Sequence, residues 1–226
     1  MTFTLVKPSA EYLGLYRDAL ERGWQPNTRR KNAASEELQE IKNDPEAFLT
    51  SRTNLEGKGV IVLPDGSTKP RLPDIECWGI EDGRFCGSIR LRWQPGTSKL
   101  PDYYPGHIGY TTVPWEEGKG YAKKALALML PLAKAAGLDL VQLVTEAGNS
   151  GSQRVIWANG GRFKGMIFPR SQYAAASLLY EIDLNNVPLP SAKVVEEHFG
   201  TTQGFLYDPR TGAGSTATPP SPAPGK

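Results

Sequence analysis

The most constraining feature of this sequence is a strand, a short loop with two glycines and a long amphipathic helix that follow one another directly. Residues 107–113 have the character of a strand, and residues 120–136 carry apolar side chains at helical spacing. Gly118 and Gly120 lie at the junction, and Gly137 is a natural end for the helix. The chain is therefore expected to pack this helix against the sheet that contains the strand.

The junction has the physical properties of an anion site. The first turn of a helix has N–H groups without partners in the helix and carries the positive end of the helix dipole. Glycines let the backbone approach a phosphate closely, so a pyrophosphate is the natural ligand, and Lys119 adds a charge. The dinucleotide fingerprint does not fit, because position 123 is Lys, and the Walker loop does not fit, because Gly120 follows Lys119. A plain strand-to-helix turn is the alternative interpretation.

The rest of the pattern predicts a mixed α/β fold around one sheet. The expected order of elements is β-α-α-β-β-β-α-β-α-β-β. Strands are expected at 2–6, 59–63, 75–80, 84–93, 107–113, 140–145, 162–168 and 177–184. Helices are expected at 9–20, over 35–41 with a restart at Asp44-Pro45, at 120–136 and at 149–159.

The dipeptide Asp82-Gly83 predicts a two-residue hairpin turn between two of these strands. Such a turn pairs Cys86 with Gly79 and Cys77 with Ser88, which leaves the two sulfurs too far apart for easy bridging. Because no cluster of histidines accompanies them, they also make a poor zinc site. We expect two reduced, structural thiols and no metal.

Composition divides the chain into one folded domain and a tail. Residues 1–186 are expected to form the domain, and residues 187–207 are an ambiguous extension with a short helix at 192–199 as one interpretation. In the segment 208–226, sixteen of nineteen residues are Pro, Gly, Ser, Thr or Ala. Such a segment buries too little apolar area to offset chain entropy, so it is expected to be disordered.

Charge and hydropathy exclude several classes of protein. Lys and Arg number 26 against 24 Asp and Glu, so a strongly basic surface for nucleic acid is not expected. The longest strongly apolar stretch, 125–136, is shorter than the ~20 residues that span a bilayer, and the N-terminus lacks the features of a signal peptide. We expect a soluble cytoplasmic protein that binds neither membrane nor nucleic acid, and its oligomeric state cannot be derived from these numbers.

Two motifs give the chain a more specific identity. The junction resembles the pattern Arg/Gln-x-x-Gly-x-Gly/Ala of the GNAT acetyltransferases, aligned as Glu117-x-x-Gly120-x-Ala122. Downstream, Asn149-x-x-Ser152 followed by Val155-Ile156-Trp157 and an Asn-Gly turn resembles the second CoA-binding element of that family. One helix and one strand separate the two motifs, as in the family. The resemblance covers roughly residues 2–184 and is strongest over 107–163.

The resemblance implies a GNAT-type fold, with a mixed, mostly antiparallel central sheet flanked by helices. It also implies an N-acetyltransferase that moves the acetyl group of acetyl-CoA to a primary amine by direct attack in a ternary complex. The backbone N–H of Val113 is implied as the donor to the thioester oxygen, and a strand splayed at that point would free backbone groups for the pantetheine arm. The implied contacts of the cofactor are Val113, Gly118, Lys119, Gly120, Tyr121, Ala122, Asn149 and Ser152.

Two positions depart from the family pattern. Glu117 replaces the usual Arg or Gln, so its side chain cannot donate a hydrogen bond to a pyrophosphate. Trp157 stands where many members carry a Tyr proposed as the acid that protonates the leaving thiolate. The need for that acid is modest, because a thiol with a pKa near 8.5 leaves readily as thiolate.

Two residues are candidates for the base that removes the proton of the amine. By family resemblance, His107 lies at the start of the strand before the loop, where several members keep a base, and histidine titrates in a suitable range. Its alternative role is a hydrogen bond to backbone. Glu76 is expected to share an apolar face with Trp78, Ile80, Phe85, Ile89 and Leu91, which could raise its pKa. Its alternative is a solvated position before the strand.

Two other functions are compatible with the same motifs. The chain could be a non-catalytic acyl-CoA-binding or sensor domain, since Glu117 and Trp157 depart from the pattern. It could also bind another anion at the same loop. The acceptor is expected to be a small-molecule or peptide amine, and the motifs do not specify which.

Overall fold

The computed structural model describes residues 2–28, 30, 32–63, 65–168 and 175–200, together with the backbone of 207–208 and 213–214. The strands are β1 (Thr4–Val6), β2 (Thr53–Asn54), β3 (Val60–Val62), β4 (Thr68–Pro70), β5 (Asp74–Glu81), β6 (Arg84–Arg92), β7 (Ile108–Thr112), β8 (Leu140–Glu146), β9 (Arg162–Ile167), β10 (Ser177–Asp183), β11 (Tyr207–Asp208) and β12 (Ala213–Gly214). The helices are α1 (Ala10–Glu21), α2 (Ala33–Asn43), α3 (Pro45–Ser51), the 3-10 turn η1 (Pro114–Glu116), α4 (Tyr121–Ala135), α5 (Ser150–Ala158) and α6 (Ala192–Phe199).

The fold is mixed α/β with antiparallel sheets flanked by helices, as expected. The third helix predicted to start at Asp44-Pro45 is present as α3, whereas the short strands β2 and β4 were not predicted. Asp44 separates α2 from α3, and its carboxylate accepts a hydrogen bond from the backbone N–H of Ala47 at 2.9 Å. This cap and Pro45 at the first helical position explain why the helix restarts there.

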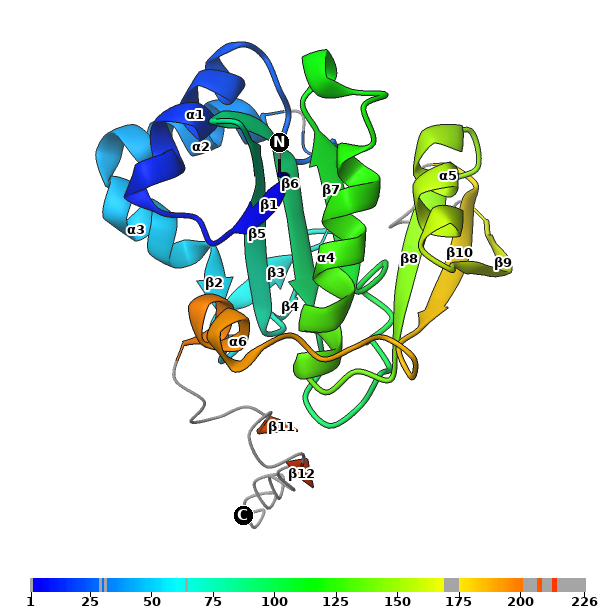
Figure 1. Ribbon diagram of the computed structural model, residues 1–226. Coiled ribbons are helices and arrows are strands. Elements are labelled where there is room, and N and C mark those ends of the chain that lie inside the picture. Colours follow the sequence, from blue (N-terminus) through cyan, green and yellow to red (C-terminus); the bar gives the residue numbers. More distant parts are fainter. Residues whose placement is uncertain are drawn as a thin grey trace, which may run out of the picture.

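The expected single sheet is divided: most of its strands form two sheets, and the strand predicted at 59–63 lies in a separate hairpin, β3-β4. The larger sheet has the order β1-β5-β6-β7, with β2 also paired to β5, and the smaller sheet has the order β8-β10-β9. Figure 1 shows α1, α2 and α3 gathered beside the larger sheet, α4 in front of it, and α5 against the smaller sheet. The boundary between the sheets falls between β7 and β8, so the strand before the glycine loop is the last of its sheet.

The hairpin between β5 and β6 forms at Asp82-Gly83, but its predicted register is wrong beyond the first two pairs. Glu81 pairs with Arg84 and Ile80 with Phe85, and then a β-bulge shifts the register, so Cys77 faces Ile89 rather than Ser88. Gly87 carries the bulge with φ 148°, and a Cβ there would lie 2.1 Å from the carbonyl oxygen of Thr111. The close approach of β7 thus requires glycine at this position. Both cysteines are buried and free.

The bulge also sorts the side chains of this hairpin between two cores. Trp78, Ile80 and Phe85 pack with α1 on one face of the sheet, where Tyr16 stacks on Trp78 with ring centroids 4.4 Å apart. Ile75, Cys77, Ile89 and Leu91 pack against α4 on the other face. The prediction that Glu76 shares a face with Ile89 and Leu91 is therefore wrong, because the shifted register pairs Glu76 with Arg90.

The ambiguous extension contains the helix that was one of its interpretations. α6 begins at Ala192, and Ser191 caps it by accepting a hydrogen bond from the N–H of Val194. Val195 and Phe199 are buried in the same core as α4, and Phe199 meets Trp93 edge-on at 6.0 Å. Residues up to 200 thus pack on the domain. The predicted disordered tail lies outside the described residues except for the short strands β11 and β12, which pair with each other.

Candidate active site

The two sheets are joined by hydrogen bonds at one end of β7 and β8 and separate beyond it. The backbone N–H of His107 donates to the carbonyl of Gln142 at 2.8 Å, and the N–H of Gln142 donates to Nδ1 of His107 at 2.9 Å. Beyond this point, the described part of the chain forms no ladder between β7 and β8. The strands therefore diverge from a common point, and their facing edges are free to pair with something else.

A cavity of about 1230 Å³ opens where the strands diverge. Residues 108–111 of β7 line one side and residues 143–146 of β8 the other. The cavity runs from α2 and α3, where most of the polar lining lies, to the start of α5. Its charged lining is Arg30, Glu36, Glu37, Glu40, Asp44, Arg52, Arg71, Glu76, Arg90, Arg92 and Glu146. This volume is large enough for a drug-sized or larger ligand.

The glycine loop leads directly into α4, as the sequence predicts. Gly118 has φ 77° and Gly120, the N-cap of α4, has φ 83°, so both occupy the left-handed region that favours glycine. A Cβ at either position would meet no atom within 4 Å, so the loop has open space beside both residues. An anion can therefore approach the backbone here, where the first-turn N–H groups of α4 have no partners within the helix.

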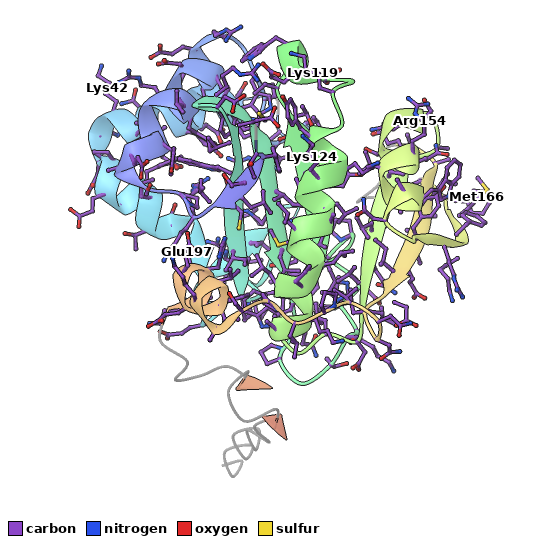
Figure 2. All side chains as sticks on the ribbon, in the orientation of Figure 1. Lys42, Lys119, Lys124, Arg154, Met166 and Glu197 are labelled. Atoms are coloured by element: carbon purple, nitrogen blue, oxygen red, sulfur yellow. The ribbon has the colours of Figure 1, made fainter. Side chains whose placement is uncertain are left out.

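Two buried carboxylates hold this loop in place. Glu116 accepts hydrogen bonds from Lys119 at 2.9 Å and from Arg84 at 3.1 Å. Glu81 accepts hydrogen bonds from Lys124 at 3.0 Å and from the hydroxyl of Tyr121. The ammonium group of Lys119 is therefore engaged in an ion pair within the loop. Tyr121 points toward the sheet, where its ring stacks on Phe3. Figure 2 shows Lys119 in the loop that precedes the long helix and Lys124 in the first part of that helix.

The second motif lines the far end of the cavity. Asn149 caps α5 by accepting a hydrogen bond from the N–H of Ser152 at 2.9 Å, and both residues line the cavity. The hydroxyl of Tyr110 on β7 donates to the carbonyl of Ser152 at 3.3 Å, and burial raises its pKa to about 12. Trp157 is not among the lining residues, and its side chain is 54% exposed, whereas the buried Ile156 does line the cavity. An acid at position 157 would therefore not reach the cavity in this structure.

His107 is completely buried at the junction of the sheets. Its Nδ1 accepts from Gln142, and its Nε2 has no hydrogen-bond partner. Burial, assisted by Arg92, lowers the pKa of His107 to about 4, so its side chain is neutral at pH 7. The alternative role named from the sequence, a hydrogen bond to backbone at a strand start, is present in the structure. The role of His107 as a base stays a prediction.

Glu76 lies in a network of ion pairs and is not solvated, so that alternative is wrong. Its carboxylate accepts hydrogen bonds from Arg90 and from the indole N–H of Trp78, at 2.9 Å for the indole, and Arg52 lies 3.8 Å away. Burial alone would raise the pKa of Glu76, but Arg90 and Arg52 lower it on balance. A carboxylate held in its charged form by two cations is a weak base, and its catalytic role stays a prediction.

The backbone N–H of Val113 is committed to the larger sheet. It donates to the carbonyl of Cys86 at 3.1 Å, so it is not available to a ligand in this structure. Since the hydrogen-bonding groups of a strand alternate between its two edges, those of Tyr110 and Thr112 are directed toward β8 instead. The donor that the resemblance implied at Val113 is therefore better sought at these two residues.

Comparison with known proteins agrees with this geometry. A family model described as the acetyltransferase (GNAT) domain matches residues 29–162, which is more than half of the chain. The chain belongs to the GNAT acetyltransferase family. Comparison with curated proteins gives no match.

Several solved structures of GNAT enzymes share the fold. RimL, a ribosomal α-N-protein acetyltransferase in complex with coenzyme A, has a TM-score of 0.54 and 10% identity, with 81% of this chain and 94% of RimL covered. The microcin self-immunity acetyltransferase MccE, in complex with acetyl-CoA and AMP, has a TM-score of 0.52 and 11% identity, with 80% and 92% covered. A chimera of the spermidine N-acetyltransferase SpeG from Vibrio cholerae has a TM-score of 0.51 and 10% identity, with 81% of this chain and 96% of the chimera covered.

Sequence reasoning missed most of the charged network of this GNAT cavity. Arg90 donates to both Asp74 and Glu76, and Arg52 donates to Glu37 at 3.1 Å. These residues come from α2, β5, β6 and the end of α3, so no short motif connects them. The signal available was weak: Arg90 and Arg92 alternate with apolar residues in a strand, which is more often a solvated face. In the described residues, no group of three or more His, Cys, Asp or Glu could hold a metal ion, and no helix could cross a membrane.

The buried imidazole of His107 is expected to make the stability of this GNAT protein depend on pH. The unfolded chain binds a proton on this residue below its ordinary pKa of 6.5, whereas the folded chain does so only near 4. This contribution to stability is present above pH 6.5 and is lost as the pH falls toward 4, by about 2–3 kcal/mol. Urea denaturation at pH 7 and pH 5 should show a smaller loss for His107→Asn than for the natural protein. Equal losses in the two proteins would contradict the assignment.

Proposed function

We propose that this protein is an acetyl-CoA-dependent N-acetyltransferase that acetylates a primary amine by direct attack in a ternary complex. The observation that carries the proposal is the cavity between the diverging strands β7 and β8. It has a free strand edge on each side, polar helices at one end and the start of α5 at the other. A long, extended thioester cosubstrate and a polar acceptor can therefore enter it from opposite ends.

The residues of the glycine loop would hold the pyrophosphate of the cosubstrate. Backbone N–H groups from Gly118 to Ala122 are the proposed donors, because both glycines leave open space beside the start of α4. Glu117 would contribute its backbone only. Lys119 would act indirectly, since its ammonium group already pairs with Glu116. Asn149 and Ser152 would border the pantetheine arm where it passes α5.

The thioester would lie beside the second half of β7, from Tyr110 to Thr112. We propose the backbone N–H of Tyr110 or Thr112 as the donor to the thioester oxygen, because the free edge of β7 faces the cavity. Such a donor stabilises the negative charge that develops on that oxygen when the amine attacks. The hydroxyl of Ser88 on β6 lies 3.4 Å from that of Thr111 on β7, and both residues line the cavity.

The amine must lose a proton before it attacks, since a primary amine has a pKa of about 10.4. His107 and Glu76 remain the proposed acceptors. His107→Gln should lower kcat/KM by about 10²-fold at neutral pH, with partial recovery at high pH, if its Nε2 takes the proton. If the folded variant keeps the pH profile of the natural protein, His107 serves only to join β7 and β8, and another group accepts the proton of the amine.

An acetylation assay tests the proposal as a whole. Release of free CoA from acetyl-CoA should require an amine, and a panel of small amines, a polyamine and peptide N-termini would identify the acceptor class. The alternative function, a non-catalytic acyl-CoA sensor, has support in the ion pairs of Glu76 and the burial of His107. It predicts binding of acetyl-CoA by calorimetry without turnover for any amine. Binding of neither acetyl-CoA nor CoA would overturn both.

A further inference from the structure

The outer edge of the smaller sheet has no strand partner in the described part of the chain. β9 is the last strand in the order β8-β10-β9 and pairs only with β10. Its other edge therefore presents backbone N–H and C=O groups without a strand partner. Natural proteins usually shield such an edge with charge, proline, a bulge or a covering element, because it pairs readily with another strand. In β9 the cations Arg162 and Lys164 and a bulge lie in the first half of the strand, and the second half is apolar.

The side chains beside this edge are apolar where solvent-facing side chains are usually polar. Trp157, Phe163, Met166 and Phe168 are 54%, 54%, 51% and 70% exposed. They are four of the seven large hydrophobic residues that are exposed in the described chain. Figure 2 shows Met166 at the outer limit of the molecule, beside the strand farthest from α4. We call these four residues the β9 patch.

A bulge places the patch on a single face of the sheet. The register shift between Leu179 and Tyr180 sets Phe163 opposite Tyr180 and Met166 opposite Leu178, which lie on the same side of β10. That is the side of α5, because Trp157 and Phe163 both meet the ring of Tyr180 edge-on, at 6.1 and 5.9 Å. Arg162 and Lys164 belong to the polar side, where Lys164 pairs with Glu181 at 3.1 Å. α5 thus covers the inner part of this face and leaves the patch uncovered.

The size of the patch suits a protein interface. Large side chains bury about 150–250 Å² each, so exposures of half to two thirds correspond to about 400–500 Å² for the four residues. This lies in the upper range for the largest apolar patch of a monomer. A stable interface needs about 800 Å² from each partner, so the patch would supply about half of that area and the strand edge with its flanking residues would have to supply the rest.

A second copy of this chain fits the edge by symmetry. A two-fold axis perpendicular to the sheet near Gly165 makes β9 antiparallel to its mate and forms one continuous six-stranded sheet. The apolar faces of both copies then lie on the same side, between the two α5 helices. Antiparallel pairing separates Arg162, at the start of β9, from its equivalent in the second copy, whereas Lys164 lies close to the axis and pairs with Glu181 on the polar side.

We infer that β9 is the interface of a symmetric dimer, in which the two strands pair antiparallel and the two β9 patches bury each other. This inference concerns association only and does not depend on the proposed acetylation. The cavity between β7 and β8 lies at the other edge of the smaller sheet, so the dimer leaves it open.

Sedimentation of the full chain over about 1–100 µM tests the inference. The natural protein should sediment as a dimer over part of this range. The double variant Met166→Lys/Phe168→Lys should weaken association by at least about 100-fold, because it places charges on the shared apolar surface. Its melting temperature at low concentration should equal that of the natural monomer, since both side chains are already exposed. Val62→Lys is the matched control, because Val62 is 71% exposed on β3 and lies outside the patch.

Either of two results would overturn the inference: a natural protein that stays monomeric throughout, or a dimer that the double variant does not weaken. Hydrogen exchange gives a second measurement that does not depend on any variant. The amides on the outer edge of β9 should exchange more slowly as the protein concentration rises, while those of β3 should not change. Uniform exchange in β9 at all concentrations would also count against the interface.

Discussion

The variant Gly120→Glu is expected to lose acetyl-CoA binding while it keeps its fold. Gly120 caps α4 with φ 83° and has no atom within 4 Å of a built Cβ, so the new side chain would enter the space in which the pyrophosphate is proposed to lie. Its carboxylate would repel the phosphates and would itself occupy the positive end of the helix. We expect affinity to fall by at least about 100-fold, measured by calorimetry with acetyl-CoA.

The matched control is Gly66→Glu. Gly66 has φ 80°, also meets no atom within 4 Å of a built Cβ, and lies in the turn between β3 and β4. Both substitutions therefore carry the same backbone strain of about 1–2 kcal/mol, and only the first lies at the start of α4. If Gly120→Glu binds acetyl-CoA as tightly as Gly66→Glu does, the cofactor does not bind at this loop. If both variants lose binding, the loss comes from strain and not from position.

Arg90→Met should be the most destabilising single change in the cavity. The guanidinium of Arg90 donates to Asp74 at 3.3 Å and to Glu76, and both carboxylates are buried, with 4% and 5% exposure. A methionine fills a similar volume but leaves two buried carboxylates with less positive charge around them. Removal of one partner from such a pair costs about 3–5 kcal/mol, which urea denaturation can measure. Arg52 near Glu76 and Arg71 near Asp74 would compensate in part.

The same substitution at an exposed ion pair provides the comparison. Arg17 lies 3.5 Å from both Asp18 and Glu21 on α1, and all three side chains are more than half exposed. Arg17→Met should therefore change stability by no more than about 0.5 kcal/mol. Equal effects at the two positions would mean that the buried network contributes no more than a surface pair. In that case Glu76 would be freer to act as a base than its contacts suggest.

The elements that local chemistry determines could be predicted from the sequence. The cap at Asp44, the turn at Asp82-Gly83 and the glycine loop before α4 each depend on a few adjacent residues, and each is present in the structure. The loop to α4 and the cap of α5 also carry the family motifs. For that reason the sequence was sufficient to predict the fold class and the family.

Features that depend on contacts between distant segments could not be predicted. The bulge at Gly87 arises because β7 approaches the hairpin closely there, and periodicity within residues 75–93 contains no sign of it. That one-residue shift reversed the face assigned to Glu76 relative to Ile89. The burial of His107 depends in the same way on Gln142, thirty-five positions along the chain. A histidine at the start of a strand looks the same in sequence whether solvent or a second strand lies beside it.

The division of the sheet between β7 and β8 has a consequence for how a bound cosubstrate and folding are coupled. In the described chain, His107 and Gln142 form the hydrogen-bonded connection between the two strands, and the rest of the facing edges stay unpaired. An extended ligand with amide groups, placed between the two strands, would form backbone hydrogen bonds with both facing edges and act as an additional strand. The ligand would then be a structural part of the domain, and the two sheets would unfold as one cooperative unit when it is bound and more independently when it is absent.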